Sequence, residues 1–247
     1  MRNLLFICLL LFAAQLLAQS NLHFKFSSFG SISSEANNPF WLHSNRYDIY
    51  PDSSAAALLR LSIESNIRQY GQFNLKFGTE IISRAGPESE AWLHQAYLQT
   101  DAWMFRLKTG WQEEKFGLNS QSRIGSFIWS RNSRPMPKVT IGIPEFYVIP
   151  WTNNYLAIKG HLSHGWFEEN RYVNTSYLHD KVGYLKFGND KDVSFVLGLH
   201  HSAQWGGKHP DFGNLSDSFN DYIKIFLAQG GGGGSPTIEQ NNALGNH

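Results

Sequence analysis

The chain has 247 residues with 21 Lys and Arg, 20 Asp and Glu and one cysteine, so its formal net charge is only +1. This balance excludes a protein that binds nucleic acid through a basic excess. The length suits one large β domain or two small ones. Beyond the first segment no apolar run reaches the roughly 18 residues that a transmembrane helix needs.

Residues 1–18 have the pattern of a secretory signal peptide. Arg2 gives a positive start, residues 4–14 form an apolar run, and Ala18 is a small residue suited to cleavage. Cys8 lies inside the apolar run rather than behind it, so a lipoprotein anchor is not predicted. Cleavage would remove Arg2 and Cys8, which leaves a formally neutral chain without disulfides. We therefore expect an exported protein that is stabilised by other means.

The first part of the mature chain predicts three strands. Residues 21–33 alternate between apolar and polar side chains. The run at 55–59, with the sequence AAALL, also suits a helix, so the start of the next element is ambiguous. Clean alternation over 60–70 and 73–83 predicts a hairpin that turns at Gly71.

The middle of the chain contains a strand pair followed by an irregular stretch. Residues 90–100 and 104–112 alternate and predict a second pair of strands. Residues 113–137 are polar, basic and rich in turn residues. A short strand is predicted over 138–143, ended by Pro144, because proline cannot donate to a strand ladder. A long irregular stretch between regular strands is either a surface loop or a functional segment.

The last part of the chain predicts three further strands and one apolar segment. Residues 155–163 alternate, and 181–187 pairs with 193–201 in a hairpin. The apolar segment 219–227 counts as a tenth strand. Residues 230–247 are rich in glycine and polar residues, which is typical of a flexible loop.

The strands combine an apolar face with a face that carries full charges. The charged positions include Arg60, Glu64, Arg68, Lys76, Glu80, Arg106, Lys108, Lys159 and Lys186. Short turns alternate with long loops, and aromatic residues stand near the strand ends. A soluble sandwich also alternates in this way. Together with the signal peptide and the missing disulfides, however, the pattern favours an all-β, antiparallel transmembrane β-barrel with lipid outside and a polar lumen.

The predicted barrel is incomplete within this sequence. About nine or ten strands are visible over 19–229, and an unpaired edge strand is not viable in hydrocarbon. We therefore expect residues 19–229 to be the N-terminal part of a larger barrel, partial or open here. Residues 230–247 would then be a flexible loop at a truncated end.

Four runs resemble a known family. They are EAWLHQAYLQ at 90–99, FIWSRNSRPMPKVTIGIPEF at 127–146, HGWFEENRYV at 164–173 and HHSAQWGG at 200–207. Together they resemble the capsule-assembly outer-membrane proteins of the Wzi type, in their Bacteroidetes-like form, over essentially the whole mature chain. The run at 127–146 is the most specific.

The resemblance implies a fold, a location and a function. The fold would be a large outer-membrane barrel whose polar lumen is plugged by irregular segments. The function would be that of a lectin-like surface protein that binds capsular polysaccharide and helps to attach or assemble the capsule. The implied partners are capsular polysaccharide, outer-membrane lipid and the barrel assembly machinery. Family members are longer, which agrees with a truncated chain.

Three clusters combine aromatic rings, which stack on sugar faces, with groups that bind hydroxyls or carboxylates. The clusters are Trp129, Arg131, Asn132 and Arg134; His164, Trp166 and Glu168; and His201, Gln204 and Trp205. An alternative is that the arginines pair with lumen glutamates such as Glu64 and Glu80 and hold the segment 117–146 in place as a plug. For the three clusters together we expect contact with polysaccharide.

Metal binding and catalysis are not predicted. The histidines at 161, 164, 179, 200, 201 and 209 match no zinc motif, and neighbouring histidines on a strand point to opposite faces. No metal or other cofactor is expected. Ser163, Ser202 and Asp180 lie near histidines in the sequence, but no GxSxG motif occurs. The expected protein is not an enzyme; the alternatives are a passive outer-membrane porin and a rim-type esterase.

Overall fold

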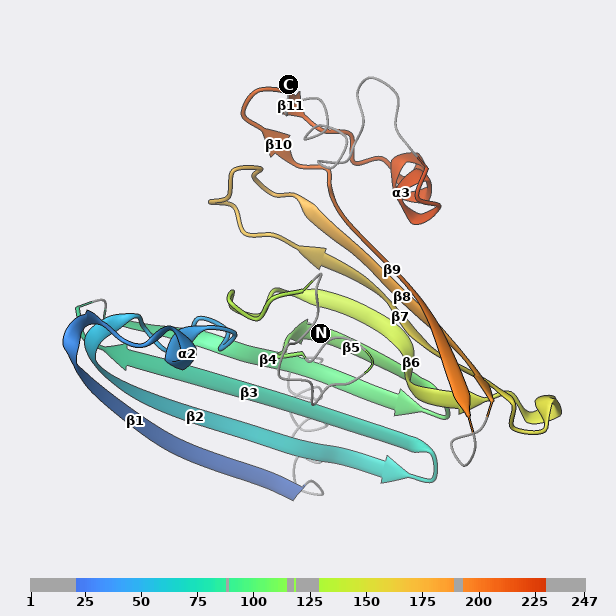
Figure 1. Ribbon diagram of the computed structural model, residues 1–247, viewed down its shortest axis with the longest axis horizontal. Helices are drawn as coiled ribbons and strands as arrows, with labels where there is room; N and C mark the ends of the chain where they lie inside the picture. Colours follow the sequence, from blue (N-terminus) through green and yellow to red (C-terminus); the bar gives the residue numbers. More distant parts are fainter. Residues whose placement is uncertain (1–20, 88, 115–117, 119–128, 189–192, 230–247) are drawn as a thin grey trace, which may run out of the picture. The chain divides into compact units, whose positions relative to one another are not determined.

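The computed structural model describes residues 21–87, 89–114, 118, 129–188 and 193–229 (Figure 1). The predicted signal peptide, the glycine-rich end and most of 117–128 lie outside the described residues. In the described part, no helix is long and apolar enough to cross a membrane.

Nine strands form one sheet in which each strand neighbours the next in the chain. They are β1 (Asn21–Asn37), β2 (Ser53–Tyr70), β3 (Phe73–Ala85), β4 (Glu90–Ala102), β5 (Phe105–Trp111), β6 (Lys138–Val148), β7 (Leu156–Trp166), β8 (Tyr177–Gly188) and β9 (Ser194–Trp205). This confirms the all-β class and the predicted hairpins. Among the described residues the order runs from β1 to β9 without a closing pair.

The chain divides into two compact units. The first unit contains residues 1–100 and 110–135, and the second contains 101–109 and 136–247. Each unit is described by itself below.

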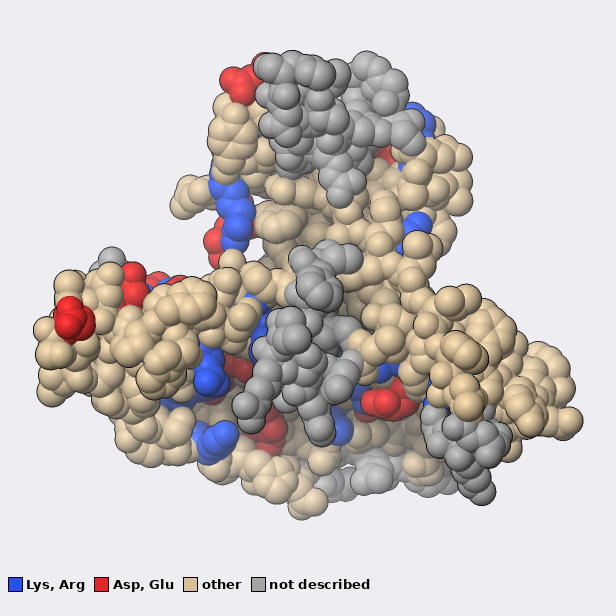
Figure 2. Space-filling view, in the orientation of Figure 1, with Lys and Arg blue, Asp and Glu red and all other residues tan. Residues whose placement is uncertain are grey.

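In the first unit, strand alternation separates an apolar face from a polar one. Leu61 lies opposite Ile81 in the ladder between β2 and β3, and both side chains are exposed. The next pair, Ser62 and Glu80, belongs to the other face, where Glu80 is buried. Acidic and basic side chains lie next to one another over the strands of this unit in Figure 2. The predicted charged face is therefore present.

The first unit has its apolar core on the same side as its charges. Tyr47, Ile49, Leu58 and Ile82 form a buried cluster against which Trp92 packs. Tyr47 and Ile49 come from the loop after the short helix α2 (Phe40–His43), so this loop is fixed onto the sheet. The ambiguous AAALL run is strand, because β2 begins at Ser53 and places Leu58 in this core.

In the second unit, β6 corrects one predicted boundary. The strand was expected to end at Pro144, but it continues to Val148. The ladder to β7 shifts register between Ile143 and Tyr147. Proline lacks the N–H that a regular ladder needs, and a bulge accommodates it. A short 3-10 helix, η1 (Pro150–Thr152), then leads to β7.

The predicted tenth strand is wrong, because the segment forms helix α3 (Phe219–Phe226). Ser218 caps the helix: its side chain accepts a hydrogen bond from the backbone N–H of Asp221. The short strands β10 (Lys208–His209) and β11 (Gly213–Asn214) precede it. The apolar spacing of this segment suits a helix as well as a strand, and the serine cap with an acidic first turn was the signal for the helix.

Both units expose large apolar side chains from their strands. The most exposed include Phe24, Phe26, Leu59, Leu61, Ile81, Leu93, Phe105, Leu107, Val139, Ile141, Phe195, Leu197 and Leu199. A soluble protein rarely leaves so many neighbouring apolar residues exposed, and such surfaces mark contact with protein or lipid.

Candidate functional site

Two loops of the first unit are hydrogen-bonded to each other. The backbone N–H of Arg131 donates to the Asn45 side-chain oxygen at 3.2 Å. In return, the Asn45 N–H donates to the side-chain oxygen of Asn132 at 2.6 Å, and the Tyr47 N–H donates to the Arg131 carbonyl. We call residues 40–50 and 129–134 the loop platform.

Three residues of the loop platform have an unfavourable backbone conformation. Asn45, Tyr47 and Asp48 all have positive φ, at 56°, 58° and 56°. This left-handed region is unfavourable for residues other than glycine, most of all for a bulky one such as tyrosine.

The Tyr47 hydroxyl donates to the Glu114 carbonyl, and burial, with the charge of Glu113, raises the pKa of Tyr47 to about 12. The phenol is therefore a proton donor at any physiological pH.

Arg134 joins the platform to the sheet. Its guanidinium forms a bidentate pair with Glu90, at 2.8 and 2.5 Å, and its Nε donates to Asp48 at 2.9 Å. The same group lies over the Trp92 ring, 4.1 Å from the centroid. The hydrogen bonds that Arg134 donates to Glu90 raise the pKa of its guanidinium above the ordinary value. For Arg134, the alternative of pairing with carboxylates is thus present, with Glu90 and Asp48 as partners rather than Glu64 and Glu80.

The other predicted residues of this cluster lie on the platform itself. The Arg131 guanidinium is 6.0 Å from the centre of the Tyr47 ring. Asn132 is exposed, and Trp129 is half-buried. Sequence reasoning missed Trp41 of α2, whose side chain is 71 % exposed. The aromatic run PFWLH at 39–43 was the available signal for it.

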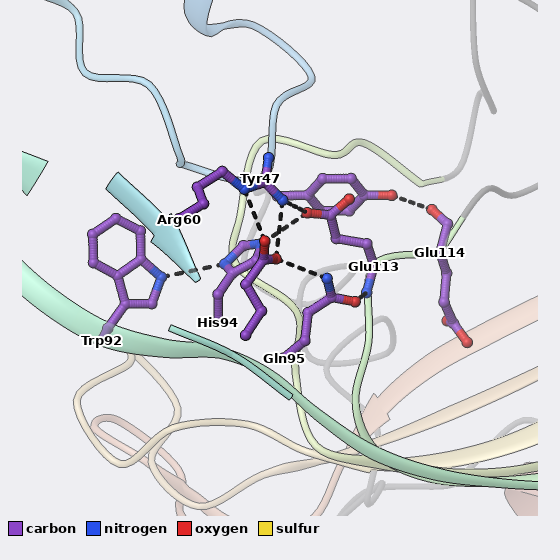
Figure 3. Close-up of polar contacts among 8 residues, drawn as sticks. Tyr47, Arg60, Trp92, His94, Gln95, Glu113 and Glu114 are labelled. Carbon is purple, nitrogen blue, oxygen red and sulfur yellow. Dashed lines mark hydrogen bonds and ion pairs between the residues drawn. The ribbon is translucent and has the colours of Figure 1, made fainter. Parts of the chain in front are cut away.

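A charged network lies beneath the platform (Figure 3). Arg60 donates two hydrogen bonds to Glu80, both at 2.9 Å, and one to Glu113 at 3.2 Å. Gln95 donates to Glu80 at 2.9 Å and accepts from the Glu113 backbone at 3.0 Å. Burial alone would raise the pKa of Glu113, but hydrogen bonds from His94 and Arg60 outweigh it and hold the pKa below its ordinary value.

His94 completes this network, and its environment argues against a metal. Ligand atoms of Glu80, His94 and Glu113 lie within 4.8 Å of one another, close enough to hold a metal ion. The Trp92 ring N–H donates to His94 Nδ1 at 3.2 Å, which leaves the proton on Nε2, 3.0 Å from Glu113. A metal-bound histidine has the reverse arrangement, with the free nitrogen donating outward. The cluster therefore fits an ion-pair network.

His94 and Gln95 are adjacent in β4, yet both reach this network (Figure 3). Neighbouring residues of a regular strand point to opposite faces. The alternation of β4 therefore changes phase at this pair, as it does at a bulge. The predicted strand was right, but the sequence did not show that both side chains share one face.

In the second unit, the structure brings parts of the two remaining clusters together. The His164 ring lies 4.9 Å from Trp166 and 5.9 Å from Trp205, measured between centroids. Tyr177 and Tyr222 complete the group. Trp205 is only 4 % exposed and packs in a core cluster. This ring therefore stabilises the fold and is covered from solvent.

The other predicted residues of the second unit lie apart. His201 contacts His179, with centroids 5.5 Å apart. Gln204 donates to the Ser176 hydroxyl at 2.6 Å. Glu168 is exposed, 3.9 Å from Arg171. The structure thus does not assemble these residues into one site.

Of the serines considered for an esterase, Ser202 contacts Asp180, where two histidines also meet. This carboxylate accepts from His161 at 2.8 Å, from His200 at 2.6 Å and from Ser202. A serine nucleophile donates to one histidine nitrogen while the acid faces the other. Here Ser202 donates directly to the acid. The His200 nitrogen on this side, Nε2, faces Asp180 as well and so does not serve as the acceptor of the serine proton. This arrangement does not activate the serine.

Comparison with known proteins identifies the family of this chain. A search of curated proteins finds no match. The sequence model of the family described as capsule assembly protein Wzi matches residues 27–247. The match includes all nine strands of the sheet, apart from the start of β1, and the whole loop platform. The chain therefore belongs to the Wzi capsule assembly protein family, and its role is in capsule assembly.

Proposed function

We propose that this protein is a non-enzymatic, lectin-like component of the bacterial outer membrane. In this role it binds capsular polysaccharide through the loop platform and so helps to attach the capsule to the cell. The observation that carries the proposal is the exposed Trp41 ring of α2, which directly precedes a loop whose backbone is fixed by Arg131 and Asn132.

The chemistry of the platform suits a carbohydrate. An exposed aromatic ring stacks on the C–H face of a sugar, and amide and guanidinium groups bind its hydroxyls and carboxylates. Trp41 supplies such a ring, and Asn132 and Arg46 are exposed polar groups of the same platform. Because the platform is already ordered by its own hydrogen bonds, binding costs little conformational entropy.

The outer membrane suits the surface of the strands. Exposed leucine and phenylalanine side chains alternate with charged and polar ones on the opposite face, which is the pattern of strands between lipid and a polar lumen. The pattern of residues 1–18 agrees with export before insertion by the barrel assembly machinery. Binding rather than catalysis is supported by the Asp180 cluster, in which Ser202 donates to the acid.

A genetic experiment tests the proposed role. In encapsulated cells that lack the gene, complementation with the Trp41→Ala variant should leave most capsule in the medium. Complementation with wild-type protein or with Trp151→Ala should retain it on the cell. Trp151 is a matched control because it is an 85 % exposed tryptophan of the second unit, in η1. Equal retention by all three proteins would overturn the proposal.

A further inference from the structure

We propose that α3 is an interfacial helix that lies on the outward face of β8 and β9 and contacts the lipid surface at the border of the membrane. The inference rests on the proposed outer-membrane location and assigns a lipid contact to a segment outside the sheet. It follows from three different flanks of this short helix, which face the strands, the lipid and water.

The first flank packs on the sheet. Ile225 is 2 % exposed and belongs to a core cluster with Ala203 and Trp205 of β9. The Tyr222 ring lies 5.6 Å from the rings of Trp205 and of His179 in β8. The helix is therefore fixed on one face of these two strands.

The covered face is the one that carries the exposed apolar residues. Residues two apart in a strand share a face, and the ladder between β8 and β9 has no register shift. Ala203 and Trp205 thus share the face of Leu197 and Leu199, which are among the most exposed apolar residues of the second unit. The helix lies on the side of the sheet that would meet lipid, at one end of the strands.

The second flank is apolar and exposed. Phe219, Ile223, Phe226 and Leu227 recur at the spacing of one helical face, and all four are exposed, Phe219 by 75 %. Burial of such residues in a membrane interface is favourable because it removes apolar surface from water. In water, the same side chains would remain an apolar patch beside the apolar face of β9.

The third flank is polar. Asn220 and Lys224 are exposed and stand one helical turn apart, and the Lys224 ammonium lies 3.2 Å from Asp221. A helix with one apolar and one charged flank is the form that lies in the plane of a membrane interface. Trp166 and Tyr177 stand at the same strand ends, where aromatic residues mark the interface of membrane barrels. These features favour lipid over a second copy of the chain as the occupant.

Single cysteine substitutions test this assignment, because the predicted mature chain has no cysteine of its own. Phe219→Cys and Ile223→Cys label the apolar flank, and Asn220→Cys and Lys224→Cys are the matched controls on the polar flank. Leu199→Cys reports membrane contact of β9 independently. Each variant carries a nitroxide in the mature protein refolded into phosphatidylethanolamine and phosphatidylglycerol liposomes. The measurement is the collision rate with oxygen, which concentrates in lipid, and with a water-soluble nickel complex.

The expected result is a several-fold higher ratio of oxygen to nickel collisions at 199, 219 and 223 than at 220 and 224. If 199 contacts lipid but 219 and 223 collide with nickel, the helix assignment is wrong and the membrane location stands. If 219 and 223 are shielded from both reagents, protein covers the helix and the assignment is also wrong. If 199 itself collides with nickel, the proposed membrane location fails, and the helix assignment fails with it.

Discussion

The two units stabilise their strand faces in different ways. In the first unit, loops are fixed over the polar face by ion pairs and by hydrogen bonds such as those of Arg134 and Asn45. In the second unit, a helix is fixed over the apolar face by rings and aliphatic contacts around Ile225. Charged contacts hold backbone in a defined geometry, as ligand recognition requires. Apolar contacts need only exclude water. The difference agrees with our proposals that the first unit carries the recognition platform and that the helix of the second unit contacts lipid.

The largest expected effect is a loss of unfolding free energy when the charged network of the first unit is broken. Arg60→Ala leaves Glu80, which is buried, without its two hydrogen bonds from the guanidinium. Loss of one partner of a buried pair costs about 3 kcal/mol of unfolding free energy. Urea unfolding in detergent micelles measures this loss of unfolding free energy. Arg106→Ala is the control, because Arg106 is more exposed and pairs with Asp101; equal losses for both variants would contradict a special role of the network.

The second largest effect is expected when the apolar contact between α3 and β9 in the second unit is removed. Ile225→Ala removes a fully buried side chain and should cost about 2 kcal/mol. The loss should be local, with faster hydrogen exchange in α3 than in β8. Ile223→Ala, on the exposed flank of the same helix, should leave exchange unchanged in detergent. If both variants behaved alike, the helix would not be fixed through Ile225.

The third expected effect tests what the contacts of Arg134 contribute to the loop platform. Arg134→Lys keeps the charge but loses the bidentate contact with Glu90 and the flat stack on Trp92. We expect faster hydrogen exchange in residues 44–50 and weaker binding of polysaccharide, with an unfolding free energy lowered by about 1 kcal/mol. Global unfolding instead would show that Arg134 supports the whole sheet. Arg171→Lys, at an exposed position of the second unit and outside the platform, is the control for charge alone.

The smallest effect is a pH dependence of the first unit. The folded pKa of Glu113 lies below its ordinary value of 4.5. Its contribution to stability is therefore fully present above that value and is lost as the pH falls through the folded pKa. Urea midpoints from pH 7 downward should decline below about pH 4.5, and the decline should be shallower in Glu113→Gln. An identical decline in the variant would mean that other carboxylates determine it.

The sequence predicted the strands well because each follows a two-residue period over many positions. It predicted the elements less well where one local pattern is compatible with two backbone structures. Pro144 ends a regular ladder but not a bulged one, and β6 continues past it. The segment 219–227 has a spacing that suits both periods, and the cap at Ser218 decided for the helix.

The site was predicted in part. Arg131, Asn132 and Arg134 stand together as the sequence suggested, but their partners come from residues 45–48 and from Glu90, far away in the chain. Such long-range partners have no local signature in a single sequence. Trp205 was expected to face a ligand and instead lies in a core that α3 covers. The burial of Trp205 was not foreseen because the helix was not predicted, since a strand at 219–227 would not have covered the ring.

Direct binding tests the central claim. Titration of purified capsular polysaccharide into the detergent-solubilised protein should give a saturable signal that Trp41→Ala lowers at least several-fold. Trp151→Ala, which removes an exposed tryptophan from the second unit, should bind as the wild type does. Unchanged binding by Trp41→Ala, or an equal loss in both variants, would contradict recognition by the loop platform.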